Sequence, residues 1–206
     1  MKKFIISTLP LRAMTKRVYS VERNALIEVK EPIYFAVNGA VSTSLKKDDD
    51  VKVILLETKG GENVGTENAM KFIDELNSFN KCGANINKEI IPTPFDESKN
   101  NFHALFKTMI ESLEPDAEIY ADITFGPRPL ALLIFSVISF AEKNFNCSVG
   151  NIVYSKVEYG KDNKIKDGSE MIYDVTPLYL LNSFINTVDS SSGENAIKAI
   201  ETLFED

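Results

Sequence analysis

The sequence predicts an α/β domain, in which an open, mostly parallel sheet carries helices on both faces and ends in an antiparallel C-terminal hairpin. Two observations lead to this fold class. Short apolar, β-branched runs alternate with longer amphipathic segments as far as Ala141, an order typical of parallel sheets. Two further strand-like runs then follow one another across a polar turn at 161–167, which indicates a hairpin.

Six segments have the composition of strands. Most are rich in valine and isoleucine, and each is bounded by polar or turn-forming residues. The first strand leaves through the polar loop Ser7-Thr8-Leu9-Pro10. The expected strands cover residues 3–8, 51–58, 86–92, 119–124, 148–159 and 169–175.

The segments between the strands carry apolar residues at helical i, i+3/i+4 spacing. Thr66, Ser98 and Thr176 are candidate N-caps, and Pro177 suits the first position of a helix. Residues 33–37 would also fit a strand, and 11–29 is interpreted as a loop. The expected helices cover 31–45, 67–79, 100–113, 130–141, a segment from 177 onward, and 194–204, which together predict a Rossmann-like arrangement.

Composition limits the possible functions. The 206 residues are 44% hydrophobic, which is enough for the core of one α/β domain. A net charge of −7 argues against broad binding to nucleic acid, duplexes included. Two cysteines without CxxC spacing suit a reducing compartment. Polar residues interrupt the apolar N-terminus, and 130–141 is shorter than the roughly 20 residues of a membrane span. We therefore expect a soluble, cytoplasmic protein without a membrane partner.

One strand-to-helix junction is the strongest candidate for a ligand site. Strand 119–124 leads through Gly126-Pro127-Arg128-Pro129 into the apolar helix, so this turn lies at the carboxyl edge of the sheet, where ligands usually bind. Thr124 offers a hydroxyl, and Gly126 allows close approach to the backbone. Arg128 stands in the first helical turn, where free amides and the helix dipole favour an anion. From spacing alone, an ordinary connection with Pro129 near the helix start is the alternative.

The four arginines fall in two places. Residues 1–30 hold Arg12, Arg17 and Arg23 and carry a charge of +5, which leaves −12 for the remainder. The fourth is Arg128, in the turn described above. Arginine is suited to bidentate phosphate contact. Because the loops after the first and fourth strands can be neighbours in a doubly wound sheet, both groups would reach one crevice; chance distribution over the surface is the alternative.

Motifs for catalysis and cofactor binding are mostly missing. His103 is the only histidine and lies within an amphipathic helix, so a Ser-His-Asp triad or a histidine metal site has little to build on. Gly60-Gly61 and Gly65 form neither a dinucleotide nor a nucleoside-triphosphate motif. We expect no metal and no cofactor, and we assign no catalytic residue. Asp122 is either a base or a structural hydrogen-bond acceptor, and its buried strand favours the second role.

Three stretches together resemble a known family. The run Asp122-Ile123-Thr124-Phe125-Gly126-Pro127-Arg128-Pro129 resembles the Asp-hydrophobic-Thr-x-Gly-x-Arg signature of CARF domains, the CRISPR-associated Rossmann-fold sensors of type III systems. The exit loop Ser7-Thr8-Leu9-Pro10 and the run Tyr173-Asp174-Val175-Thr176-Pro177-Leu178 are similar to two further regions of that family. The sequence departs from the family at Phe125, where a histidine is frequent, and at Pro127, where a phenylalanine is common.

The resemblance implies a homodimer whose two-fold axis passes through the ligand pocket. It also implies a cyclic oligoadenylate as ligand, most often cyclic tetra-adenylate. A two-fold dimer would double each anion-binding turn and match a ring of phosphates with internal symmetry. By motif position, the pocket would be formed by Ser7, Thr8, Pro10, Leu11 and Arg12, with Thr124, Gly126, Pro127 and Arg128 beneath the adenylate backbone; Asn38 and Lys16 are further candidates.

The resemblance leaves more than one function open. As a sensor, residues 1–189 would bind the ring, and the helix in 190–206 would connect to an effector, either a further domain or a separate partner. As a ring nuclease, the chain would cleave the ring by metal-independent attack of a ribose 2′-hydroxyl, with Ser7, Thr8, Arg12 and Arg128 positioning the phosphate. An unrelated nucleotide-binding regulatory α/β domain is the third possibility.

Overall fold

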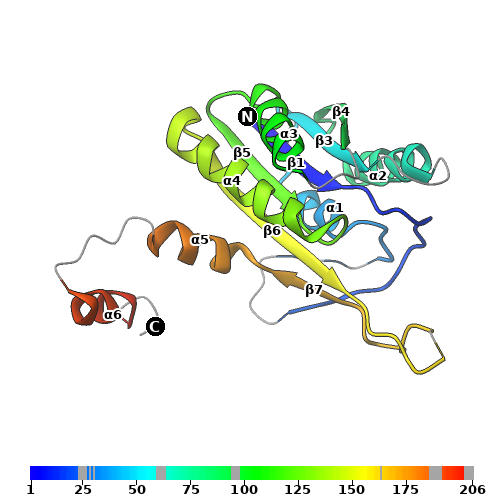
Figure 1. The fold of residues 1–206 in the computed structure, drawn as a ribbon. Helices are drawn as coiled ribbons and strands as arrows, with labels where there is room; N and C mark the ends of the chain where they lie inside the picture. The colour runs from blue at the N-terminus through cyan, green and yellow to red at the C-terminus, as the bar shows by residue number, and fades with distance from the viewer. Residues whose placement is uncertain are drawn as a thin grey trace.

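The computed structural model describes residues 1–22, 27, 29, 31–58, 64–93, 98–162, 164–185 and 192–201. Within these residues the chain forms a seven-stranded sheet with the order β2-β7-β6-β5-β1-β3-β4, covered by helices on both faces (Figure 1). The predicted fold class is therefore confirmed. Arg23 of the N-terminal arginine group and the Gly60-Gly61 pair lie outside the described residues.

Five neighbouring strands of the sheet run parallel to one another, and each of them corresponds to a predicted strand. The predicted strand at 119–124 ends two residues early, and the one at 148–159 ends three residues early. The five parallel strands are β1 (Lys2–Thr8), β3 (Asp50–Thr58), β4 (Asn85–Thr93), which forms one edge of the sheet, β5 (Ala117–Asp122) and β6 (Ser148–Lys156).

The hairpin edge contains one strand that the sequence did not predict. β7 (Met171–Asp174) pairs antiparallel with β6, as expected. Beyond it, the short β2 (Ser20–Val21) pairs parallel with β7, so the interpretation of 11–29 as a loop is wrong at this point. The amide of Ser20 donates to the carbonyl of Glu170, just before β7, at 2.9 Å, and the amide of Glu22 donates to the carbonyl of Ile172 in β7 at 3.0 Å. The buried ring of Tyr19 holds this segment against the core.

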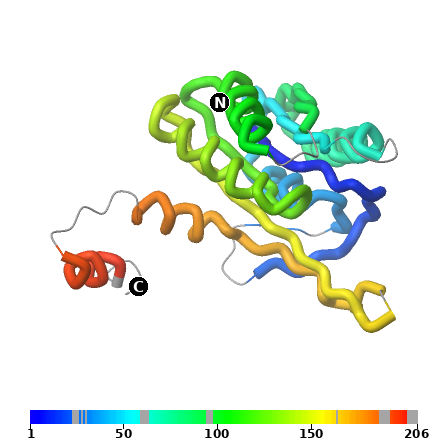
Figure 2. The backbone as a smooth tube through the Cα atoms, viewed as in Figure 1, coloured from blue at the N-terminus to red at the C-terminus, as the bar shows by residue number. Residues whose placement is uncertain are grey.

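Helices cover the two faces unequally (Figure 2). α1 (Ala36–Ser42) and α2 (Val64–Phe79) pack on one face around Phe35 and Phe72, whose ring centroids are 4.8 Å apart. The second face carries α3 (Lys99–Glu111), α4 (Arg128–Phe145) and α5 (Thr176–Ile185). The last described helix is α6 (Gly193–Glu201). No helix in the described ranges is long and apolar enough to cross a membrane.

Helix starts differ from the predictions at several positions. Ser98 is the N-cap of α3, as predicted, and its hydroxyl accepts the Asn101 amide. Thr66 lies inside α2 and is not its cap. Thr176 is the first residue of α5, and its hydroxyl donates to Asp174 while it accepts the Ile152 amide at 2.8 Å, so it does not cap the helix. Residues 202–204 of the predicted last helix lie outside the described residues.

α1 is shorter than the helix predicted over 31–45. Residues 31–35 are not helical, because Ile33 forms an antiparallel bridge with Arg17 and Glu75 accepts the amides of Tyr34 and Phe35 at 2.6 and 3.0 Å. The strand alternative for 33–37 is therefore partly right. The helix then begins at Ala36.

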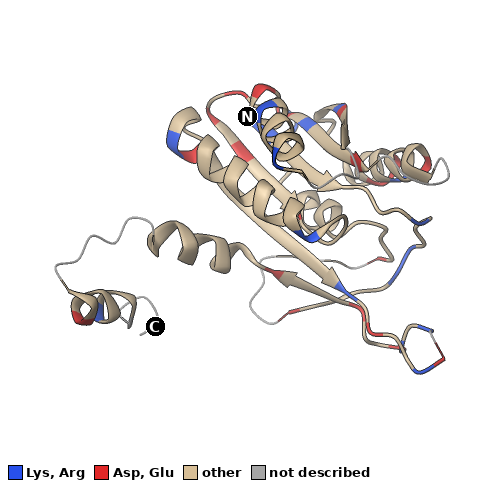
Figure 3. Cartoon of the chain, in the orientation of Figure 1, with Lys and Arg blue, Asp and Glu red and all other residues tan. Residues whose placement is uncertain are grey.

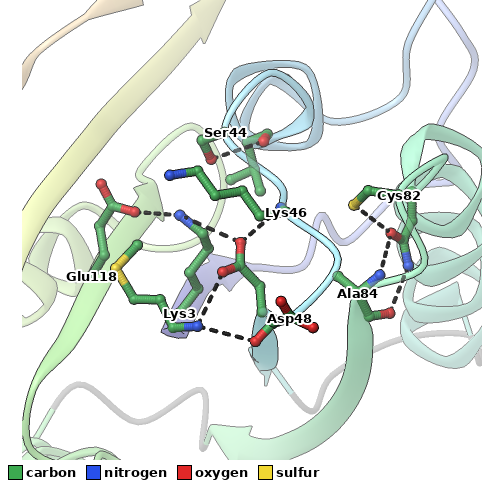
Figure 4. A network of polar contacts seen from close by, with 11 residues as sticks. Lys3, Ser44, Lys46, Asp48, Cys82, Ala84 and Glu118 are labelled. Atoms are coloured by element: carbon green, nitrogen blue, oxygen red, sulfur yellow. Dashed lines mark hydrogen bonds and ion pairs between the residues drawn. The ribbon is translucent and has the colours of Figure 1, made fainter.

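The amino end of the sheet is fixed by a buried ionic cluster (Figure 4). The Lys3 side chain is 1% exposed and is bonded to Glu118, with Asp49 at 3.8 Å. Asp49 also binds the N-terminal ammonium at 3.2 Å and accepts the Lys46 amide at 2.9 Å. Because a buried cation must be paired, this cluster holds β1, β3 and β5 together at the edge opposite the predicted site.

Candidate functional site

The two predicted ligand loops lie side by side at the carboxyl edge of the sheet. β1 and β5 are parallel neighbours in which Ser7 is level with Asp122, so both loops leave the sheet from the same row. β3 flanks β1 on its other side, which makes this the switch point of the sheet. The Thr8 hydroxyl donates a hydrogen bond to the Phe125 carbonyl oxygen and joins the loops directly. The predicted proximity of these loops is confirmed.

The turn after β5 is held by contacts with β5 itself, with β6 and with the end of β1. Asp122 Oδ1 accepts the Thr124 amide at 2.8 Å, and Thr124 Oγ1 accepts the Ser155 amide of β6 at 2.8 Å. Gly126 has a φ of +84°, a conformation that favours glycine. A β-carbon at Gly126 would lie 3.2 Å from both Thr8 Cβ and Leu130 Cδ1. The turn is therefore built for close packing against the loop after β1.

α4 begins in this turn and presents a reduced set of amides. Arg128 is its first residue, and Pro129 has no N–H to donate. The Leu130 amide is used by the Pro127 carbonyl at 3.0 Å. Among the described residues, no acceptor is present for the amides of Phe125, Gly126 and Arg128. These three amides lie at or just before the positive end of an 18-residue helix, a position that favours an anionic oxygen.

The loop after β1 is held in place by Asn68 of α2. The Asn68 side chain is fully buried and donates to the carbonyls of Pro10 and Arg12 at 3.0 and 2.9 Å. Its Oδ1 accepts the Met14 amide at 3.2 Å. Sequence patterns did not predict Asn68 as part of this site. The sequence feature that could have indicated its role is a polar side chain on the otherwise apolar face of α2, four residues before the buried Phe72.

The arginines differ in their pairing. Arg17 lies 3.9 Å from Glu170 and is partly buried. Arg12 and Arg128 are exposed, and within the described ranges neither guanidinium has a hydrogen-bond or ion-pair partner. Arg12 and Arg128 thus give each of the two adjoining loops one cation that has no partner among the described residues. A ligand that carries several negative charges would complement them.

Several predicted site residues support the loops from within. Ser7 and Thr8 are buried, and the Ser7 hydroxyl lies 3.4 Å from the Thr8 carbonyl oxygen. Pro10 is also buried, whereas Leu11 is 47% exposed beside Arg12. In this structure the two hydroxyls are therefore turned into the protein, and the exposed part of the first loop is Leu11 and Arg12.

Asn38 lies in the contact between α1 and α2. Its amide group donates to the Phe72 carbonyl at 3.0 Å and to Glu75 Oε2 at 3.1 Å, and burial raises the pKa of Glu75. Lys16 lies over the ring of Tyr34, 5.3 Å from its centroid. Asn38 is thus engaged between α1 and α2, and Lys16 is engaged with Tyr34 shortly before α1.

Asp122 is buried directly below the turn. Burial raises its pKa to about 6, although contacts with the Thr124 hydroxyl and amide and with the Val37 amide oppose the rise. Its Oδ2 has no hydrogen-bond partner within the described ranges. A general base must reach its substrate, and this carboxyl is 0% exposed. The geometry therefore favours a structural acceptor over a base.

No group of three or more metal-ligating side chains is present in the described part of the chain.

Two hollows in the surface lie away from the adjoining loops. One of about 420 Å³ lies between α1 and the end of α2. Another of about 510 Å³ lies between α4 and α5, and none of the predicted site residues lines either of them.

Comparisons of sequence and structure give the following findings. No protein-family model and no curated protein sequence matches the chain. Among solved structures, Csm6 of Enterococcus italicus bound to cyclic hexa-2'-fluoro-hexa-dAMP is similar over 91% of this chain and 40% of its own, with 14% identity and a TM-score of 0.44. Phosphofructokinase-2 of Escherichia coli in complex with fructose-6-phosphate is similar over 76% and 55%, with 11% identity and a TM-score of 0.36. The chain thus spans about half of these proteins or less.

Proposed function

We propose that this chain is a sensor that binds a cyclic oligoadenylate, in type III CRISPR defence, as a homodimer. One observation carries the proposal: the loop with Arg12 and the turn with Arg128 are bonded to each other through Thr8, and both guanidiniums lack a partner in the described residues. The motif Asp122–Arg128, which resembles the CARF signature, lies at this point.

The chemistry of the ligand suits this crevice. Each phosphodiester of a cyclic oligoadenylate carries one negative charge, and arginine and free amides at a helix start are its usual donors. One chain offers two guanidiniums and three amides. A second chain, related by a two-fold axis, would double this set and surround a ring that has two-fold symmetry itself. Cyclic tetra-adenylate is the ring we expect.

A ring nuclease is the second candidate, and the same unpaired arginines support it. A ribose 2′-hydroxyl would attack the adjacent phosphorus, the bond to the 5′-oxygen would break, and a 2′,3′-cyclic phosphate and a 5′-hydroxyl would result. Arg12 and Arg128 would stabilise the phosphorane charge. The buried hydroxyls of Ser7 and Thr8 offer little help, so binding without cleavage is favoured.

Calorimetry with cyclic tri-, tetra- and hexa-adenylate, with AMP as the comparison ligand, tests the proposal. Chromatography of each mixture follows the products. We expect one tetra-adenylate ring per two chains, recovered intact. Linear products would instead make the chain a ring nuclease. Preference for AMP would indicate an unrelated nucleotide-binding domain, and binding of no ring would overturn the proposal.

A further inference from the structure

α5 is apolar on all sides, yet only part of it is covered. Its sequence has no charged residue, and Figure 3 shows it entirely in the neutral colour. Tyr179 anchors it to α4, because the buried ring packs edge-on against Phe135 at 5.4 Å and the hydroxyl bonds Glu142. Leu178 and Leu180 on the other sides are 59% and 51% exposed. Helices that are apolar all round are normally buried, so this surface indicates a further partner.

The uncovered surface includes a groove between α4 and α5. Its volume is about 510 Å³, and Leu132 at its rim is 70% exposed. The α4 side chains that line it recur at i, i+3, i+4 and i+7, so the groove follows the helix axis. Its polar members are uncharged. The groove is lined by Leu132, Phe135, Ser136, Ser139, Leu178 and Asn182.

α6 carries an apolar face that is only partly covered, with Ala196 and Ile200 half-buried and Ile197 exposed. The helix has its own start, since the Ser192 hydroxyl accepts the Asn195 amide at 3.3 Å. Glu194 and Lys198 form an ion pair at 3.2 Å on one side. The other side presents Ala196, Ile197 and Ile200, and Ile197 is 59% exposed. In Figure 1 α6 stands apart from α5.

We propose that α6 docks in the α4–α5 groove of its own chain, with Ala196, Ile197 and Ile200 toward the groove. Residues 186–192 connect α5 to α6, a length within the roughly 2–8 residues that join antiparallel helices in bundles. α5 has 10 residues and α6 has 9, so the two helices match in length. A short tether gives α6 an effective concentration that a separate partner rarely reaches. The ion pair of α6 would stay in solvent, and no charge would be buried.

Cross-linking in the full chain tests this docking. The chain carries Cys82→Ser to remove the half-buried thiol, together with Ser136→Cys on α4 and Ala199→Cys on the flank of α6; Cys147 is buried. A short bismaleimide should link the two positions within one chain, at a rate independent of protein concentration. The control chain carries Met70→Cys in place of Ser136→Cys, together with Ala199→Cys. Met70 is exposed on α2, on the other face of the sheet, so this pair should not link.

Two further variants test whether contact between apolar side chains holds α6 in the groove. Ile197→Asp should slow the link roughly fivefold or more, because it puts a charge in the groove. Leu132→Asp should do the same without touching α6. The matched control Glu194→Gln, on the polar face, should link at the original rate. The proposal is overturned if the pair links no faster than the Met70 control, or if both aspartate variants link normally. Links between two chains would assign the groove to a second copy instead.

Discussion

The Thr8 hydroxyl donates to the carbonyl oxygen of Phe125, across 117 residues of sequence. The bond joins the end of β1 to the turn before α4, the two segments that carry Arg12 and Arg128. The residues between β1 and Arg12 and those between β5 and α4 lie outside helices and strands, so the position of the two loops relative to each other depends on side-chain contacts such as this one. The Thr8 hydroxyl, although it is buried, therefore helps to fix the position of the loop with Arg12 relative to the turn with Arg128.

Thr8→Val tests that influence. Valine keeps the β-branched shape but removes the donor, which should cost about 1–2 kcal/mol of folding free energy because the carbonyl loses its partner. We expect ring affinity, measured by calorimetry, to fall more than the loss of stability alone explains. Thr66→Val, at an exposed position of α2, should change neither quantity. Unaltered ring affinity in Thr8→Val would show that the crevice does not depend on this bond.

Arg128→Ala should weaken ring binding and leave folding nearly unchanged. A charge-assisted hydrogen bond contributes about 1.5–3 kcal/mol, which corresponds to roughly tenfold to a hundredfold in Kd. Because Arg128 is exposed and no partner for its side chain is present in the described residues, the melting temperature should stay the same. Lys143→Ala removes an exposed cation from the last turn of the same helix and serves as control for net charge. A large drop in melting temperature would show instead that Arg128 is structural.

Gly126→Ala should lower both stability and affinity. Alanine at a φ of +84° is strained, and its β-carbon would crowd Thr8 and Leu130 at 3.2 Å. Gly168→Ala is the matched control, since its φ is +75° and nothing lies within 4 Å of the added carbon. Urea denaturation should therefore show the larger loss at Gly126, by about 1 kcal/mol or more. Equal losses in the two variants would mean that the close packing of Gly126 is unimportant.

The sequence was most informative where the signal is local. The parallel strands and the junction from Asp122 to Arg128 were predicted because apolar runs, glycine and proline determine the conformation of the residues next to them. β2 was missed because two residues carry no pattern, and only pairing with β7 makes them a strand. Thr66 failed as a cap because α2 begins two residues earlier.

The candidate site was less accessible to sequence reasoning, because much of it depends on tertiary contacts. Asn68 fixes the loop after β1 from 56 and 58 residues away, through two backbone carbonyls. Asn38 matched a site position in the sequence, but the buried carboxylate of Glu75 holds it between two helices. Polar residues at such positions can face either a ligand or the core. Only the packing of α1 and α2 decides between the two.

Asp122 should make stability depend on pH in a defined direction. Burial raises its pKa from 3.8 to about 6, so between these values the folded chain keeps a proton that the unfolded chain has released. Stability from this group is therefore complete below about pH 4 and is lost as the pH rises through 6. Asp122→Asn has no proton to lose, and its Oδ1 still accepts the Thr124 amide.

The variant should consequently lose less stability than the original chain between pH 4 and pH 7, as measured by urea denaturation at a series of pH values. Glu75 is also buried with a raised pKa, but it is present in both proteins and cancels in the difference. Asp162→Asn, on the exposed turn between β6 and β7, should leave the profile unchanged. Parallel profiles for Asp122→Asn and the original chain would show that this carboxyl ionises without cost, and that the turn above it is open to water.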